Sequence, residues 1–229
     1  MTDYLTKAQH FFEKHRNMGA AVPMAKYMKN QFSFLGIPAS KRKDIFRVFF
    51  NTFPIPDLDT SKIIVKELFN LPEREYHYFA IQLLTKHKKR WAPTDIIYFE
   101  SLILTNSWWD TVDLISSRII APFFKKYPNL TGAMTDSWSA SKNIWLKRVS
   151  IIFQLSYKEN TNTEILTRHI LDNASHSDFF IQKAIGWALR EYSKTDYKWV
   201  LNFVIQSSAL KPLSKREAIR WIDNKGLIE

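Results

Sequence analysis

The chain has 229 residues, of which 45% are hydrophobic and 24% charged, a composition typical of a folded globular protein. It contains no cysteine, which excludes disulfide bonds, thiolate nucleophiles, zinc fingers and iron–sulfur clusters. The net charge of +11 favours a polyanionic partner, either nucleic acid or an anionic membrane surface. We find no secretion signal and no apolar run that approaches the roughly 18 residues of a membrane span, so we expect a cytoplasmic protein.

Apolar residues recur at the i, i+3, i+4 spacing of amphipathic helices along the whole chain, and segments with strict strand-like alternation are hard to find. The pattern predicts an all-α protein. We expect helices over residues 3–16, 22–34, 39–51, 58–70, 73–89, 94–105, 107–126, 130–139, 143–158, 163–173, 178–194, 197–206 and 213–224. No linker or low-complexity segment interrupts them, so we expect one domain over residues 1–229.

Five of these segments resemble one another and begin roughly 35 residues apart, near Glu75, Trp108, Trp145, Phe180 and Ser214. A period of this length, built from pairs of helices, is typical of an α-solenoid, in which each unit buries its apolar stripe against the next. A bundle of helices with similar lengths is the alternative. A solenoid has a concave face, and a concave basic groove would suit a nucleic acid duplex.

The segment that begins at Ser107 places an acidic and an aromatic residue on one helical face. Trp109 and Asp113 are four residues apart and therefore lie one turn from each other. A negative charge inside a positive groove would repel phosphate. We therefore expect Asp113 either to pair with an arginine or to meet positive charge that develops on a substrate.

Two later segments carry candidate phosphate ligands. Arg148 lies to one side of the apolar stripe of its segment, and a guanidinium matches phosphate geometry in a bidentate manner. In the segment over 178–194, Lys183, Trp187 and Arg190 share a face beside the apolar stripe. In one interpretation they line a nucleic-acid groove, where the cations bind phosphate and the ring contacts sugar or base. In the other, Lys183 and Arg190 are ordinary surface charges and Trp187 covers an edge of the core.

Other chemistries find no support in the sequence. It has no glycine-rich phosphate loop, no His-Glu-x-x-His and no Gly-x-Ser-x-Gly, and its six histidines lack the spacing of metal ligands. Glu73 and Glu75 precede a helix, where we expect them to interact with the helix dipole. We therefore expect no metal and no cofactor.

Six ordered segments resemble the AlkD family of bacterial DNA alkylation repair glycosylases, and the resemblance runs from about residue 5 to residue 224. The segments are PMAKYMKN (23–30), LPEREY (71–76), SWWDTVD (107–113), NIWLKR (143–148), FIQKAIGWALREY (180–192) and PLSKREAI (212–219). The resemblance implies a HEAT-like α-solenoid.

The resemblance also implies an activity. A monofunctional glycosylase would remove cationic N3- or N7-alkylated purines, such as 3-methyladenine and 7-methylguanine, from double-stranded DNA without flipping the base, and would leave an abasic site. Matching motif positions imply catalytic roles for Trp109, Asp113 and Trp187 and DNA-binding roles for Tyr27 and Arg148. Lys183 and Arg190 are further candidate phosphate ligands, because they are cations on the same helical face as Trp187.

The expected partner is duplex DNA with alkylated purines, with no membrane and no obligate protein partner. We expect a monomer in the bacterial cytoplasm, associated with the nucleoid when bound to DNA. Two alternatives remain. One is a non-catalytic HEAT-like protein that binds distorted or damaged duplex DNA, and the other is a scaffold for protein–protein contacts.

Overall fold

The computed structural model describes residues 3–227, and within this part of the chain the structure is helical without a β-strand. An isolated parallel bridge joins Ser33 and Glu73. The expected all-α fold is confirmed. None of the described helices is both long and apolar enough to cross a membrane.

The chain divides into two compact units, Met1–Trp91 and Ala92–Glu229, which are described separately. The first contains α1 (Asp3–Glu13), α2 (Met18–Tyr27), α3 (Ala39–Thr52), α4 (Leu58–Phe69) and α5 (Arg74–Thr85). The second contains α6 (Asp95–Leu104), α7 (Trp109–Ile115), α8 (Ala121–Lys126), α9 (Thr131–Ala140), α10 (Ile144–Ile152), α11 (Thr163–Asp172), α12 (Phe179–Tyr192), α13 (Tyr197–Gln206) and α14 (Pro212–Asp223). The single domain over 1–229 remains a prediction.

In the first unit, α1 packs on α3 and α4, and α4 packs on α5. Phenylalanine rings fill the space between them, with Phe49 and Phe79 at 5.0 Å and Phe12 and Phe79 at 4.8 Å between ring centroids. Glu75 lies in the first turn of α5, at the helix start where the sequence analysis expected it. Its side chain is fully buried, and its carboxylate accepts backbone N–H groups from Leu35, Gly36 and Ile37, each at 2.9 Å.

The second helix differs from the predicted segment 22–34, because it begins and ends several residues earlier. Asn17 caps it, since its side chain accepts the backbone N–H of Ala20 at 3.1 Å. Lys29 and Asn30 then adopt positive φ angles of 54° and 56°, a conformation that ends a helix. Pro23 lies inside this helix.

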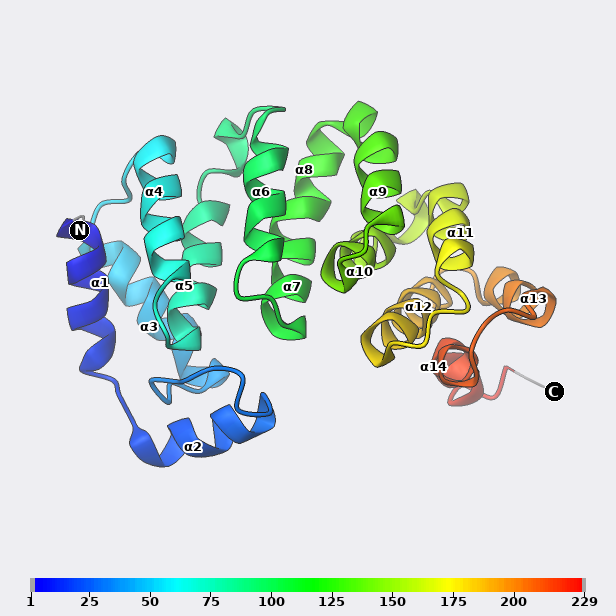
Figure 1. Ribbon diagram of the computed structural model, residues 1–229, viewed down its shortest axis with the longest axis horizontal. Coiled ribbons are helices and arrows are strands. Elements are labelled where there is room, and N and C mark those ends of the chain that lie inside the picture. The colour runs from blue at the N-terminus through cyan, green and yellow to red at the C-terminus, as the bar shows by residue number, and fades with distance from the viewer. Residues whose placement is uncertain (1–2, 228–229) are drawn as a thin grey trace. The chain divides into compact units, whose positions relative to one another are not determined.

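In the second unit, α7, α10, α12 and α14 form a row in which each helix packs on the next (Figure 1). A second row lies against the first, because α6 packs on α7, α9 on α10 and α13 on α12. Helices of the first row begin at Trp109, Ile144, Phe179 and Pro212, which agrees with the predicted period of roughly 35 residues. This pairwise order is that of an α-solenoid. The basic concave groove remains a prediction.

The predicted helix over 107–126 is not a regular α-helix throughout in the structure. It begins at Trp109, and a π-helical segment over Ser116–Ile120 joins α7 to α8 without a break in the helical run. Such a segment carries an extra residue per turn and is frequently found at functional sites. Val112, Ile115 and Ile119 still form the buried stripe, each fully inaccessible to solvent.

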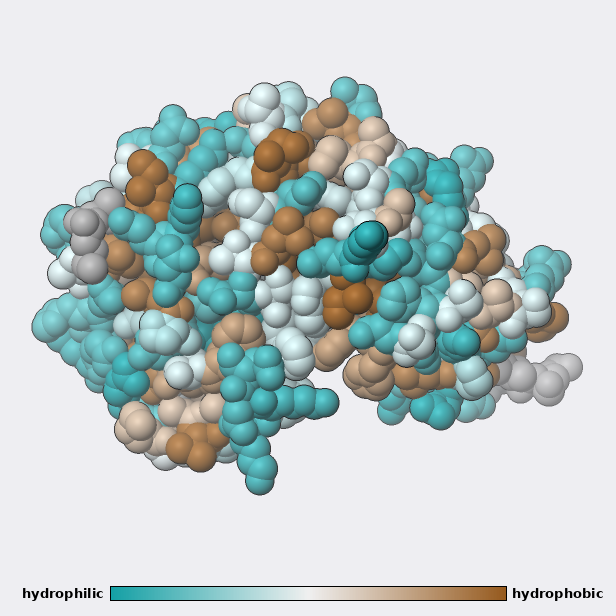
Figure 2. Space-filling view, in the orientation of Figure 1, coloured by the Kyte–Doolittle hydropathy of each residue, from teal (hydrophilic) through white to brown (hydrophobic). Residues whose placement is uncertain are grey.

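Hydrophobic residues on the visible surface occur in small separate groups among polar and charged residues (Figure 2). The described exposed apolar side chains of the second unit are correspondingly spread over several helices, with Ile97 on α6, Leu171 on α11 and Ile205 on α13. Single apolar residues of this kind are ordinary for a protein surface.

Candidate functional site

Asp113 on α7 and Arg148 on α10 form a two-pronged ion pair in the second unit. Arg148 Nε donates to Asp113 Oδ1 at 2.7 Å, and Arg148 Nη2 donates to Asp113 Oδ2 at 2.8 Å. The arginine side chain is 6% exposed and the aspartate side chain 16%. Of the two alternatives that the sequence left open for Asp113, pairing with an arginine is therefore present in the structure.

The arginine is also tied to the start of α12. Its Nη1 donates to the backbone carbonyl of Phe180 at 2.6 Å. The Phe180 ring packs against Trp108 and Trp145, with centroid distances of 5.2 Å and 5.1 Å. Three helices of the row thus converge on one guanidinium, which fixes the orientation of the aspartate.

Side-chain caps determine where α10, which carries Arg148, and α12, which supplies the Phe180 carbonyl, begin. Asn143 accepts the backbone N–H groups of Trp145 and Leu146 at the start of α10. Asp178 accepts those of Phe180 and Ile181 at the start of α12. Such caps satisfy N–H groups that a helix cannot pair internally, and they hold Arg148 and the Phe180 carbonyl in register.

Two opposing influences act on the Asp113 carboxyl group. Burial disfavours its charged form and raises its pKa above the ordinary value, an effect that Asp110 reinforces through charge repulsion. The hydrogen bonds and positive charge of Arg148 act in the opposite direction, without cancelling the effect of burial. The site therefore holds an oriented carboxylate that is more basic than a solvated aspartate.

The two predicted catalytic tryptophans are both half-buried. Trp109 is the first residue of α7, one turn before Asp113. Trp187 lies in the middle of α12 and packs against the core shared by α10 to α14. Neither tryptophan is fully buried, and packing against the core supports Trp187.

The predicted phosphate ligands Lys183 and Arg190 share an acidic partner that the sequence analysis missed. Lys183 Nζ lies 3.0 Å from Glu217 Oε1, and Arg190 Nη1 donates to Glu217 Oε2. Glu217 belongs to α14, about thirty residues away in sequence, and its side chain is 9% exposed. One signal was available in the sequence, because Gly186 is unfavourable in a helix unless another backbone approaches closely.

Tyr27, the remaining predicted DNA ligand, belongs to the first unit. It is the last residue of α2 and is 71% exposed. Its proposed role with the residues of the second unit remains a prediction.

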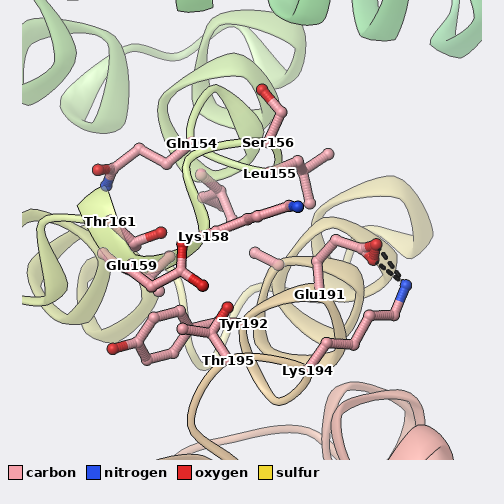
Figure 3. Close-up of a pocket in the computed structure, with 13 residues that line it drawn as sticks. Gln154, Leu155, Ser156, Lys158, Glu159, Thr161, Glu191, Tyr192, Lys194 and Thr195 are labelled. Carbon is pink, nitrogen blue, oxygen red and sulfur yellow. Dashed lines mark hydrogen bonds and ion pairs between the residues drawn. The ribbon is translucent and has the colours of Figure 1, made fainter.

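A cavity of about 530 Å³ lies elsewhere in the second unit, near the C-terminal ends of α10 and α12 (Figure 3). Lys158, Tyr192 and the ion pair of Glu191 with Lys194 are among the residues that line it. It includes neither Asp113 nor the two predicted catalytic tryptophans. Among the described residues, no three histidine or carboxylate side chains gather so that they could hold a metal ion.

Comparison with known proteins assigns the family. The model of the DNA alkylation repair enzyme family matches residues 8–222. A solved structure described as a predicted DNA alkylation repair enzyme from Enterococcus faecalis is similar, with 30% sequence identity and a TM-score of 0.84 over 90% of this chain and 96% of the other. No curated protein matches. The chain belongs to the DNA alkylation repair enzyme family, which implies that its substrate is DNA.

Proposed function

We propose that the protein is a monofunctional DNA glycosylase that hydrolyses the N-glycosidic bond of cationic N3- or N7-alkylated purines in duplex DNA and leaves an abasic site. The observation that carries the proposal is the half-buried Asp113 carboxylate, which Arg148 orients one helical turn from Trp109. The net charge of +11 supports a DNA substrate.

The chemistry of the lesion matches a site with one such carboxylate. Alkylation at N3 or N7 makes the purine cationic, so it leaves with the bonding electron pair as a neutral base and needs no general acid. The sugar acquires oxocarbenium character, which a nearby carboxylate stabilises electrostatically. Water then attacks C1′, and its proton passes to Asp113 or to solvent.

Burial and the arginine fork give Asp113 properties suited to this role. Burial raises its pKa and so increases its basicity toward water, while Arg148 stabilises its charged form. Both carboxylate oxygens are held by the fork, so little reorganisation is needed as positive charge develops.

The two tryptophans supply aromatic surface for the sugar and for the cationic base. Trp109 and Trp187 are both half-buried, and Trp187 is held by packing against the core. A cation over such a ring gains on the order of 1–2 kcal/mol when water is excluded. We propose that the lesion is recognised in place, against these rings, without a pocket for a flipped base.

The three basic residues of the site differ in how many of their N–H donors are used inside the protein. Arg148 uses three of its five N–H groups inside the protein, so it acts mainly by positioning Asp113, and any contact with phosphate falls to its two remaining N–H groups. Lys183 and Arg190 are 34% and 25% exposed and keep further donors for phosphate. We propose that these two residues carry most of the phosphate contact of the second unit. Tyr27, in the first unit, is proposed as a separate DNA contact.

A pair of isosteric substitutions tests the proposal on a duplex with a single 7-methylguanine. Asp113→Asn removes the proposed stabilising charge, and we expect base release to fall by about 10² to 10³ while DNA affinity is unchanged or higher. Asp110→Asn removes the same charge from the same helix and should change the rate only a few-fold. Full activity of Asp113→Asn would refute the carboxylate assignment. Tight binding by the unmodified protein without any base release would favour the non-catalytic alternative.

A further inference from the structure

Glu217 is held against α12 by unusually close helix packing. A Cβ atom added at Gly186 of α12 would lie 2.4 Å from Glu217 Cβ and 3.0 Å from the carbonyl oxygen of Ser214. Ser214 Oγ also donates to the carbonyl of Gln182 at 3.0 Å. The backbone that carries the Glu217 carboxylate therefore has a fixed position relative to α12.

The carboxylate bridges two cations of α12. Lys183 reaches one oxygen and Arg190 the other, while Arg220 of α14 lies farther off, at 3.9 Å. Burial acts to raise the pKa of Glu217, but its contacts with Lys183 and Arg190 outweigh burial and keep the pKa below the ordinary value. The bridge is therefore fully ionised near neutral pH.

The two bridged cations flank a proposed catalytic residue. Trp187 follows Lys183 by four residues and precedes Arg190 by three, so all three occupy one face of α12. Long basic side chains are otherwise free to sample many rotamers. The bridge restricts both of them at the face where Trp187 is accessible.

We propose that Glu217 is a positioning residue of the DNA-binding surface: it fixes Lys183 and Arg190 on either side of Trp187 and thereby sets the register of the phosphates relative to the reacting sugar. The inference rests on the proposed function, because it assigns these cations to phosphate. It predicts two opposite effects of the carboxylate. Its charge weakens attraction for any duplex, while its geometry promotes reaction at the lesion.

Glu217→Gln separates these effects, because it keeps the size of the side chain and removes its charge. We expect affinity for undamaged duplex to rise about 3- to 10-fold, and the slope of log affinity against log salt to steepen by about one unit as the freed cations engage another phosphate. We expect base release from a 7-methylguanine duplex at saturating protein to fall about 10-fold, because the phosphates are no longer held in register. Glu191→Gln is the matched control, since it breaks the ion pair with Lys194 on the same helix.

Glu217→Asp keeps the charge but shortens the side chain. It should leave affinity and salt slope near those of the unmodified protein and still slow base release. The inference is overturned if Glu217→Gln and Glu191→Gln have equal effects on affinity, salt slope and rate. If Glu217→Gln does not fold, the test rests on Glu217→Asp. A rate of base release by Glu217→Asp equal to that of the unmodified protein then overturns the inference. If the unmodified protein releases no base, the proposed function fails, and the affinity and salt slope still show whether Glu217 restrains the two cations.

Discussion

Removal of Arg148 should leave the Asp113 carboxylate buried without its partner. The Arg148→Met variant keeps most of the apolar stem but deletes two hydrogen bonds, of 2.7 and 2.8 Å, to the carboxylate and one to the Phe180 carbonyl. Breaking a buried ion pair in this way costs about 3–5 kcal/mol. Because the Asp113 side chain is 16% exposed, we expect the lower end, about 3 kcal/mol at pH 7.

Thermal unfolding measures this loss. For a chain of this length, about 3 kcal/mol corresponds to a decrease in Tm of roughly 6–12 °C. Arg168→Met is the matched control, since Arg168 donates twice to Asp136 in a pair whose side chains are 45% and 50% exposed. An exposed pair contributes at most about 1 kcal/mol, so the control should lower Tm by only a few degrees.

The loss of stability in Arg148→Met should also depend on pH in a defined direction. Without Arg148, burial raises the pKa of Asp113 further, so the folded variant retains a proton that the unfolded chain releases. The contribution of Asp113 to the stability of the variant is then most favourable below the unfolded pKa of aspartate and becomes less favourable as the pH rises through the folded pKa. The deficit relative to the unmodified protein should therefore be smaller at pH 4.5 than at pH 7. A deficit that is independent of pH, or no larger than that of Arg168→Met, would refute the argument.

Three further outcomes follow from the contacts. Gly186→Ala should destabilise the protein by about 1–3 kcal/mol in urea unfolding, because the added Cβ would lie 2.4 Å from Glu217 Cβ. Gly132→Ala, with no atom within 4 Å of the added Cβ, should be neutral or stabilising. Equal effects of the two substitutions would contradict this packing. Glu75→Gln should lower the free energy of unfolding by at least about 2 kcal/mol, since the buried carboxylate accepts three backbone N–H groups. An unchanged Tm would show that these N–H groups find other acceptors. The rate of base release should fall as the pH decreases through the raised pKa of Asp113, and a rate that is constant down to pH 4 would argue against an ionised carboxylate.

The helical architecture could be predicted because its cause is local. Amphipathic periodicity marks each helix, and the recurrence of similar helices fixes the solenoid order of the second unit. Helix ends were less predictable where a single side chain decides them. Asn17 caps α2, so the helix begins at Met18, four residues before the predicted start at residue 22. The positive φ of Lys29 then ends it early, despite the apolar residues that follow.

The site was predictable in part for the same reason. Trp109 and Asp113 share a turn of one helix, and the charge conflict around Asp113 indicated an arginine partner as one of two alternatives. Glu217 could not be found in this way, because its contacts with Lys183 and Arg190 depend on how closely α14 packs against α12. The burial of Glu75 could not be predicted for a related reason, since its three N–H partners lie about forty residues away in sequence.

The most direct test of the account is a count of products from a duplex that carries one 7-methylguanine. Free 7-methylguanine is measured by chromatography, and abasic sites are measured in the same DNA. We predict that both appear above the spontaneous rate, in equal amounts and with intact strands, and that Asp113→Asn lowers both rates by about 10² to 10³. Tight binding with no base released above the spontaneous rate would contradict the glycosylase assignment.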